Sequence, residues 1–460
     1  MSTEAREPSS DASLSPQPTL IPLPPEDPGP PEAPGGRPRV QRPDRRQVAI
    51  RMLSLDALLP EDHQARVVWD YVHALDLTPL YDQIRAVEGH VGRNAIDPKI
   101  LMALWLYATL DGEGSARRLD QLCKDHVVYQ WICGGVSVNY HTLSDFRTAH
   151  PQVLDEMLTQ SVASLVHEGL VTMERVAQDG MRVRASAGAA SFRRAPTLQE
   201  CQAQAKEQVE ALQKELEANP GASSKRQQAA RRRAARERAE RIARAMEEVA
   251  KVEAKKKADE KEKARASTTD PDARVMKMPD GGYRPAQNVQ FVTDTASQIV
   301  TDVNVLNTGS DLGQMGPMVE QHEERYGQPP KEILVDGGFA KREDIEKVTE
   351  GGTTVYAPVQ KPRNPDQDRH EPRPRDSEVV AAWRVRMGTD EAKAIYKERA
   401  STAECVNAIS RNRGLTRFLV RGLAKVRCVG LWHAIAHNLV RAATLRAVAA
   451  LRAEAIVIPA

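Results

Sequence analysis

The sequence predicts an α/β protein in which a strand-forming core is combined with long helical regions. Two acid–glycine pairs stand in strand-like settings: Asp179-Gly180 within residues 175–184, and Asp336-Gly337 directly after Ile333–Val335. A short apolar run bounded by glycine is typical of a strand buried on both faces. Capping signals and helical periodicity fill most of the remaining chain, so we expect a sheet accompanied by helices.

Length and composition limit the class of protein. A chain of 460 residues is too long for one core, so two or three domains are expected. Aromatic residues make up 4% and charged residues 28%, which indicates an aliphatic, helix-rich core. Five scattered cysteines without a CxxC pair indicate reduced thiols and no zinc cluster. No apolar run approaches about 18 residues and no secretory signal is visible, so no membrane partner is expected.

The first half of the chain divides into a tail and a helical region. Residues 1–46 are rich in Pro, Ser, Gly and charge, which predicts a disordered tail. Residues 47–169 show helix starts at Asp97-Pro98 and Ser115, and Thr142 with Asp145 resembles a capping box.

Short helices that carry Arg117, Arg118 and Arg147 suit a DNA-binding module of the helix-turn-helix kind. An ordinary helical packing domain is the alternative.

An insertion follows the first strand. Residues 199–266 predict two antiparallel helices that are broken at Asn219-Pro220-Gly221, the second running from about Ser223 to Ala266. The basic runs at 231–233 and 255–257 suit phosphate contacts, with a solvated charged face as the alternative.

Strands are expected to return at 288–293 and 299–306, which a hairpin-length turn joins. A helix over 311–325, the Asp336 strand and a strand at 353–357 follow, and residues 379–455 are helical and basic.

Asp179 and Asp336 are the first candidate metal ligands, and Glu404 in the C-terminal helical region is the candidate third acid. Carboxylates suit Mg²⁺, and two such ions serve phosphoryl transfer. Arg399 and Arg411 are placed to hold a scissile phosphate through charge-assisted bonds.

The spacing of the third acid leaves two alternatives. Glu404 follows Arg399 by five residues, which on a regular helix separates the two side chains by roughly 140°. A helical bulge would restore the geometry, or else Glu398 is the third acid. His433 and His437 lack the Glu of a zinc-binding HExxH motif, so we interpret them as residues of a core helix.

Several motifs in order resemble one family. The N-terminal pieces LPEDHQARVV, IDPKILMALWLYATLDG and HTLSDFR, the segment Asp270–Asp294, the two acid–glycine motifs, RNRGLTRFLVRGLAKV, and AHNL at 436–439 are similar to a DDE transposase of a bacterial insertion sequence. Within this family the sequence resembles the insertion sequence 1182 type, which has an InsH-type N-terminal domain. Phe339 and Arg411 depart from the family, which often has Tyr and Lys at these positions.

The resemblance implies an RNase H-like catalytic core in residues 170–198 and 267–455, a helical N-terminal DNA-binding domain in 47–169, and a helical hairpin inserted at 199–266. It also implies catalysis by Asp179, Asp336 and Glu404 with Mg²⁺ or Mn²⁺. The expected partners are double-stranded DNA (terminal inverted repeats and target) and a second copy of the chain on DNA, in the bacterial cytoplasm at the nucleoid. A transposase-derived DNA-binding protein without catalytic activity is the alternative.

Overall fold

The computed structural model describes residues 54–86, 89, 94–218, 224–362, 364 and 366–457, and side chains as far as residue 453. The expected tail, residues 1–46, and the break at Asn219-Pro220-Gly221 lie outside the described residues. From Ser54 onward the chain forms one unit.

A mixed sheet is built around the first strand of the chain. β1 (Arg175–Arg184) is central, with the antiparallel β5 (Tyr283–Asp294) on one side and the parallel β7 (Glu332–Leu334) on the other. β4 (Arg274–Lys277) and β6 (Val300–Leu306) both pair with β5, and β8 (Thr354–Tyr356) pairs in parallel with β7. The predicted strands at 288–293, 299–306 and 353–357 are confirmed, and so is the α/β class.

Two hydrophobic clusters bury the sheet, and the strand before Asp336 is buried on both of its faces. Met181 and Val183 of β1 pack with Val289 of β5 in a cluster that also includes the helices before β1 and the last helix. Ile333 and Leu334 of β7 belong to a second cluster with helices that follow the sheet. This two-sided burial is why the strand before Asp336 is a continuous apolar run.

The helices before β1 start largely where the capping residues predict. They are η1 (Asp56–Leu58), α1 (Gln64–Ala74), α2 (Thr78–Tyr81), α3 (Pro98–Leu110), α4 (Ala116–Asp125), α5 (Val127–Cys133), α6 (Tyr140–Ala149) and α7 (Pro151–His167). The Asp97 carboxylate caps α3 by accepting the Lys99 N–H at 2.8 Å, and the Ser115 hydroxyl caps α4.

The predicted capping box at Thr142 and Asp145 is wrong. α6 starts earlier, where the Asn139 side chain accepts the N–H groups of His141 and Thr142 at 3.0 and 3.1 Å. Thr142 is therefore already inside the helix.

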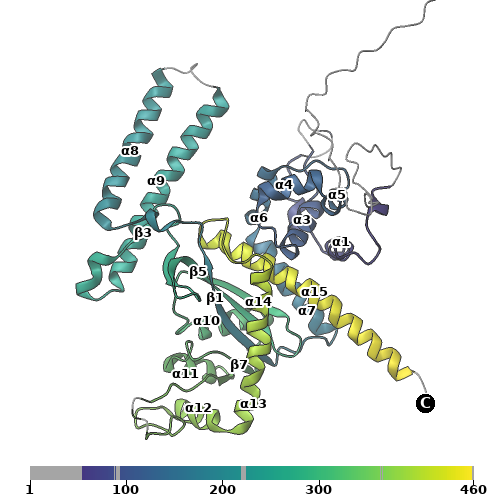
Figure 1. The fold of residues 1–460 in the computed structure, drawn as a ribbon, viewed down its shortest axis with the longest axis vertical. Helices are drawn as coiled ribbons and strands as arrows, with labels where there is room; N and C mark the ends of the chain where they lie inside the picture. Colours follow the sequence, from purple (N-terminus) through teal and green to yellow (C-terminus); the bar gives the residue numbers. More distant parts are fainter. Residues whose placement is uncertain are drawn as a thin grey trace, which may run out of the picture. The chain divides into compact units, whose positions relative to one another are not determined.

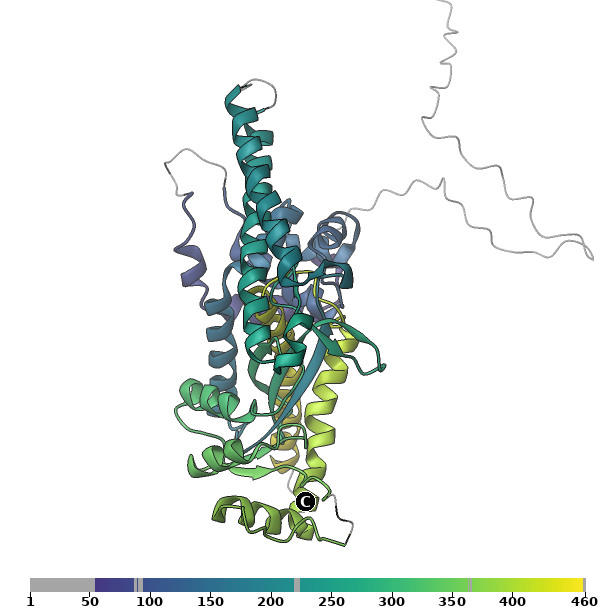
Figure 2. The same cartoon turned by 90° about the vertical axis from the view of Figure 1, so that its left-hand side faces the viewer.

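The inserted hairpin consists of α8 (Ala195–Ala218) and α9 (Lys225–Ala254). The two helices lie side by side in Figure 1 and one behind the other in Figure 2. Arg231 binds Glu215, and Arg238 donates to Gln208, so the helices run antiparallel. The base of the hairpin is fixed by the ion pair between Arg244 and Asp272 at 2.9 Å.

α9 ends at Ala254, earlier than the predicted Ala266. The η3 turn (Ala258–Lys263) follows, and β3 (Ala266–Ser267) pairs with β2 (Phe192–Arg193), just after the η2 turn (Ala189–Ser191). The residues after Ala254 have a helix-forming composition but do not continue the helix, because the buried Ala264 and Ala266 pack with Leu198 instead. The insertion is thereby closed at its two ends.

The helices after the sheet strands are α10 (Met315–Tyr326), α11 (Arg342–Glu350), α12 (Glu378–Gly388), α13 (Asp390–Arg399), the π-helical turn η4 (Ala400–Glu404), α14 (Cys405–Asn412) and α15 (Leu423–Val457). α15 packs against α3, α6 and α7 as well as β6. Within the described residues, no helix is both long and apolar enough to cross a membrane.

Polar contacts fix α15 at the turn between β5 and β6. The Asn438 amide binds both the N–H and the C=O of Val300, at 2.8 and 2.7 Å. His437 Nε2 lies 2.9 Å from the Gln298 carbonyl oxygen, and Arg441 Nε donates to the Ser297 carbonyl. The AHNL segment is therefore an anchor of the last helix, and His437 is a buried residue of that helix.

Candidate active site

Asp179 lies on β1, and Asp336 follows the end of the neighbouring strand β7 by two residues. β1 and β7 pair in parallel, with Ala177 opposite Leu334, and the same register continued by two residues brings Asp179 opposite Asp336. Residues opposite one another on parallel strands project from the same face of the sheet. Asp336 also acts electrostatically on Asp179, so the two carboxyl groups belong to one site.

The turn after β7 is shaped around the Asp336 carboxylate. Asp336 Oδ1 accepts the Gly338 N–H at 2.7 Å, and a Cβ at Gly338 would lie only 2.9 Å from that oxygen. Neither Gly337 nor Gly338 has a positive φ angle. Gly338 therefore leaves room for the neighbouring carboxylate.

Glu404 reaches the site through a π-helical turn. The helix that begins with α13 passes through η4 before it continues as α14, in line with α13 beside β1 (Figure 1). The wider turn of a π-helix brings residues five apart onto one face. Arg399 Nη1 accordingly donates to Glu404 Oε1 at 3.0 Å. The helical bulge, one of the two alternatives that the spacing left open, is present.

Arg399 links two of the three acids. Its Nη2 donates to Asp179 Oδ1 at 3.0 Å while its Nη1 binds Glu404. Burial alone would lower the pKa of Arg399, but Asp179, Asp336 and Glu404 together with Tyr396 raise that pKa above its ordinary value. The Arg399 guanidinium thus carries a positive charge that interacts with all three acids.

Asp179 is deeply placed in this cluster. Burial raises the pKa of its carboxyl group, Arg399 opposes that rise, and Asp336 adds to it. The Asn407 amide Nδ2 donates to Asp179 Oδ2 at 2.9 Å and also favours the ionised form. Both oxygens of Asp179 are therefore held by side chains from the α13–α14 segment.

Asn407 is a residue of the site that the sequence analysis did not identify. It lies one turn after Glu404 on α14 and is 3% exposed. Its Oδ1 is buried and has no hydrogen-bond partner among the described residues. A polar side chain next to Ala403 and Val406, on the buried face of that helix, is the signal that would have revealed it.

Glu398 is engaged elsewhere. Its Oε1 pairs with Arg175 Nη1 at 2.7 Å, and Arg175 also pairs with Glu332. Arg175 begins β1, four residues before Asp179, which corresponds to roughly 13 Å along a strand. The structure thus associates Glu404, and not Glu398, with Asp179.

The reverse face of β1 is also polar. Gln178 donates to Gln290, and Asn288 and Gln290 both donate to Asp311 Oδ1, at 2.6 and 2.7 Å. A Cβ at Gly180 would lie 2.4 Å from that same Asp311 oxygen. These hydrogen bonds stabilise β1 on the face opposite to the Asp179 side chain.

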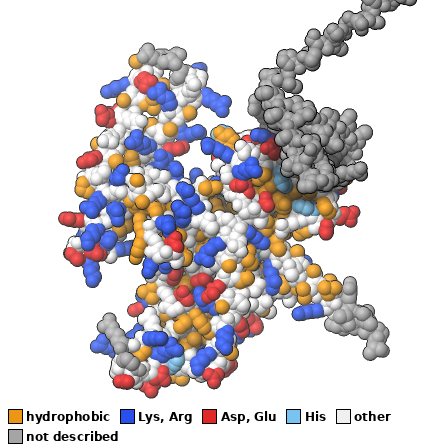
Figure 3. Space-filling view, in the orientation of Figure 1, with side chains coloured by type: hydrophobic (Ala, Val, Ile, Leu, Met, Phe, Trp, Pro, Cys, Tyr) orange, Lys and Arg blue, Asp and Glu red, His pale blue; other side chains and the backbone are white. Residues whose placement is uncertain are grey.

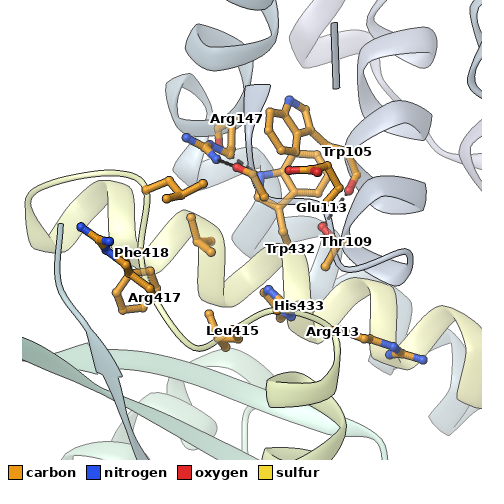
Figure 4. A pocket seen from close by; sticks show the side chains of 14 residues that line it. Trp105, Thr109, Glu113, Arg147, Arg413, Leu415, Arg417, Phe418, Trp432 and His433 are labelled. Atoms are coloured by element: carbon orange, nitrogen blue, oxygen red, sulfur yellow. Dashed lines mark hydrogen bonds between the residues drawn. The ribbon is translucent and has the colours of Figure 1, made fainter. Parts of the chain in front are cut away.

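The arginines expected to contact DNA differ in exposure. Arg117, Arg118 and Arg411 are exposed. Arg147 is only 7% exposed: it donates to the Gly114 carbonyl and lies 4.8 Å from the Trp105 ring centre (Figure 4). Burial lowers the pKa of Arg147 to about 10. Its burial removes Arg147 from the surface that DNA can reach.

Arg147 also borders a cavity of about 40 Å³ between α3 and the segment from Arg413 to His433 (Figure 4). That volume suits about two water molecules. Arg147, Arg413 and His433 line the cavity, and each has a buried side-chain nitrogen without a hydrogen-bond partner among the described residues. It is a packing feature between the N-terminal helices and α15, separate from the three acids.

The acids match a divalent cation in donor chemistry, because carboxylate oxygens are the ligands that Mg²⁺ and Mn²⁺ prefer. In the part of the chain described, no three His, Cys, Asp or Glu side chains come close enough together to hold a metal ion. Glu404, whose side chain is 57% exposed, is bound to Arg399. The guanidinium thus occupies the position between Asp179 and Glu404.

Two family descriptions match the chain. "Transposase domain (DUF772)" matches residues 53–149, and "Transposase DDE domain" matches residues 360–443. The chain is a DDE transposase of an insertion sequence. No curated protein and no solved structure matches the transposase.

The second match contains Arg399, Glu404 and Asn407 of the site, whereas Asp179 and Asp336 precede it. The DDE domain makes the transposase a DNA phosphoryl-transfer enzyme and implies an RNase H-like fold. The first match covers the helices from η1 to α6.

Proposed function

We propose that the transposase cleaves DNA strands at the ends of an insertion sequence and joins them to target DNA, with Asp179, Asp336 and Glu404 as its acidic triad. The observation that carries this proposal is the shared guanidinium: Arg399 binds Asp179 and Glu404 at once, and Asp336 acts on the same group. These contacts of one guanidinium support a shared role for three acids that are distant in sequence.

Strand order supports the RNase H-like assignment of residues 170–198 and 267–455. Three antiparallel strands, β6, β5 and β1, continue into the parallel β7 and β8, so the first strand is central and carries the first acid. The hairpin of α8 and α9 interrupts this core between β1 and the strands that follow. We assign residues 47–169 to the DNA-binding domain that precedes the core.

The cation would be Mg²⁺ or Mn²⁺, held by carboxylate oxygens of Asp179, Asp336 and Glu404. When bound, it would activate the attacking oxygen and stabilise the leaving one in phosphoryl transfer. Asn407 keeps Asp179 oriented. Arg399, once released from the two carboxylates, provides a guanidinium for the scissile phosphate, and the exposed Arg411 adds a second one.

The substrates in this proposal are the terminal inverted repeats and a target duplex, bound by two copies of the transposase in the bacterial cytoplasm. A water attacks at the transposon end, and the freed 3′ hydroxyl then attacks the target. The insertion sequence 1182 type is the subgroup that the pair of domains suits.

A pair of isosteric substitutions tests the proposal on a duplex that carries the repeats flanking the gene. Glu404→Gln removes one negative charge from the triad, so we expect unchanged end binding and cleavage reduced roughly 10²–10⁴-fold, the equivalent of several kcal/mol. Glu398→Gln is the matched control. Arg175 keeps Glu332, so unfolding free energy should change by less than about 1 kcal/mol and cleavage should be unchanged.

The opposite result, cleavage lost in Glu398→Gln and kept in Glu404→Gln, would exclude the assignment of the third acid. Cleavage equal in the wild type and in both Glu404→Gln and Asp336→Asn would show that these acids have no catalytic role.

A further inference from the structure

One face of α9 carries a concentration of positive charge. Between residues 225 and 244 there are nine Lys or Arg residues and two Glu residues. The side of α9 that faces α8 carries the buried Ala235 and Ile242. Lys225, Arg232, Arg233 and Arg236 recur at helical spacing on the other side, where all four are exposed. Figure 3 shows Lys and Arg side chains along the hairpin.

The basic residues of α9 differ in their partners. Arg231 pairs with Glu215 of α8 at 2.8 Å, and Arg244 pairs with Asp272. Lys225, Arg232 and Arg236, by contrast, form no ion pair with any described residue. Arg233 has a single contact, with Glu237 at 3.8 Å, and its side chain is 77% exposed. The charges on the outward face are therefore not needed to hold the hairpin together.

A groove lies beside this face. A hollow of about 570 Å³ is bordered by Arg241 and Arg244 of α9, by Ser144 and Thr148 of α6, and by Arg421 and Lys425 at the start of α15. Four acids border it as well, namely Asp145, Glu237, Glu240 and Asp270. Lys425 is exposed and has no ion-pair partner among the described residues. The groove therefore carries basic side chains and hydroxyl groups together with these four acids, and the unpaired positive charge is concentrated on the outward face of α9.

We propose that the outward face of α9, defined by Lys225, Arg232, Arg233 and Arg236, binds the phosphate backbone of double-stranded DNA. This inference rests on the proposed function, which makes duplex DNA the substrate. It names a surface, distant from the three acids, that contacts the same DNA.

The dimensions and chemistry of the face fit this partner. From Lys225 to Arg236 the helix rises roughly 16 Å, a length over which a duplex presents on the order of ten phosphate charges. Long flexible cations on one side of a straight helix neutralise phosphates without reading base sequence. Binding is therefore strongly dependent on salt and independent of the terminal-repeat sequence.

The test uses the full-length transposase and a fluorescent duplex, with anisotropy measured across a range of NaCl concentrations in EDTA. The variant combines Arg232→Gln, Arg233→Gln and Arg236→Gln. Loss of three phosphate contacts should lower the slope of log affinity against log salt by about 2.7 and weaken binding roughly a hundredfold near 0.1 M salt.

A matched control combines Arg231→Gln, Arg238→Gln and Lys251→Gln, which removes the same charge from α9 at residues bound to Glu215, Gln208 and Glu248. Its salt slope should stay close to that of the wild type. Lysine at positions 232, 233 and 236 should retain most of the affinity, because the face supplies charge and not bidentate recognition. Circular dichroism confirms that each variant retains its helices.

Equal losses of affinity in the test and control variants would overturn the proposal, because net charge alone would then explain them. Unchanged duplex affinity in the test variant would also overturn the proposal. A variant that keeps its duplex affinity but no longer binds phosphatidylserine vesicles or single-stranded RNA would overturn it in the same way. Cleavage is measured separately, with Mg²⁺ in place of EDTA, and a wild type that binds the duplex but never cleaves it there contradicts the proposed function alone. A test variant that binds and cleaves normally contradicts the α9 surface alone.

Discussion

Acidification should destabilise the transposase through the two histidines of α15. Burial lowers the pKa of His433 to about 3, with Arg413 acting in the same direction. Burial also lowers the pKa of His437 to about 4, although its bond to the Gln298 carbonyl opposes this shift. Both pKa values lie below the ordinary 6.5, so the two residues stabilise the fold above that pH and lose this contribution as the pH falls.

The magnitude follows from proton binding to the unfolded chain. At about pH 5.5, an unfolded histidine of pKa 6.5 is protonated about ten to one, whereas the buried form stays neutral, which costs about 1.4 kcal/mol per histidine. The pair should therefore lower the free energy of unfolding by about 3 kcal/mol between roughly pH 7.5 and 5.5.

Urea unfolding at the two pH values measures this difference. Buried carboxyl groups such as Asp179 titrate as well, so the informative quantity is the difference between the wild type and His433→Leu. His433 Nδ1 has no hydrogen-bond partner among the described residues, and an apolar side chain leaves no broken bond at that position. The variant should lose about 1.4 kcal/mol of the pH dependence. A pH dependence identical in both proteins would refute the reasoning.

Three further substitutions test individual contacts: a close approach to Gly180, the buried Asp302 carboxylate, and the hydrogen bond from Asn407 to Asp179. Gly180→Ala should destabilise the fold by about 1–3 kcal/mol in thermal unfolding, because the new Cβ meets Asp311 at 2.4 Å, whereas Gly188→Ala, with open space around it, should be neutral. Asp302→Asn should cost about 1–3 kcal/mol in urea, because the buried His322 loses its carboxylate partner and Arg325 keeps only Asp155. Glu168→Gln in an exposed pair should cost less than about 1 kcal/mol, and equal effects would contradict the argument. Asn407→Leu should weaken Mn²⁺ binding roughly 10–100-fold by calorimetry, while Asn412→Ala at the exposed end of α14 should not; unchanged affinity would show that Asn407 does not orient Asp179.

Sequence patterns predicted the elements that depend on contacts between residues close together in the chain. Asp97 and Ser115 cap helices where the motifs place them, and the apolar run before Asp336 is a strand buried on both faces. The five-residue interval from Arg399 to Glu404 left a bulge and Glu398 as alternatives, and the π-helical turn provides the bulge.

Features decided by distant contacts were not visible in the sequence. α9 ends early because Ala264 and Ala266 pack against Leu198, more than 60 residues upstream. Arg147 is a basic residue on a short helix and was therefore expected to contact DNA, yet it is buried against Trp105 and the Gly114 carbonyl. Asn407 was overlooked because one polar residue on a helix has no pattern until Asp179 is placed beside it.

The position of α15 has a consequence for genes that have been cut short. One hydrophobic cluster contains Leu101 and Leu104 from the first helices and Leu431 and Ile435 from the last one. A ribosome adding about 5–20 residues per second needs on the order of half a minute to travel from the first pair to the second. A copy of the element interrupted by an early stop codon would therefore encode helices that lack their final packing partner. We expect such products to be degraded, so decayed copies should not accumulate proteins that occupy the repeats of an intact one.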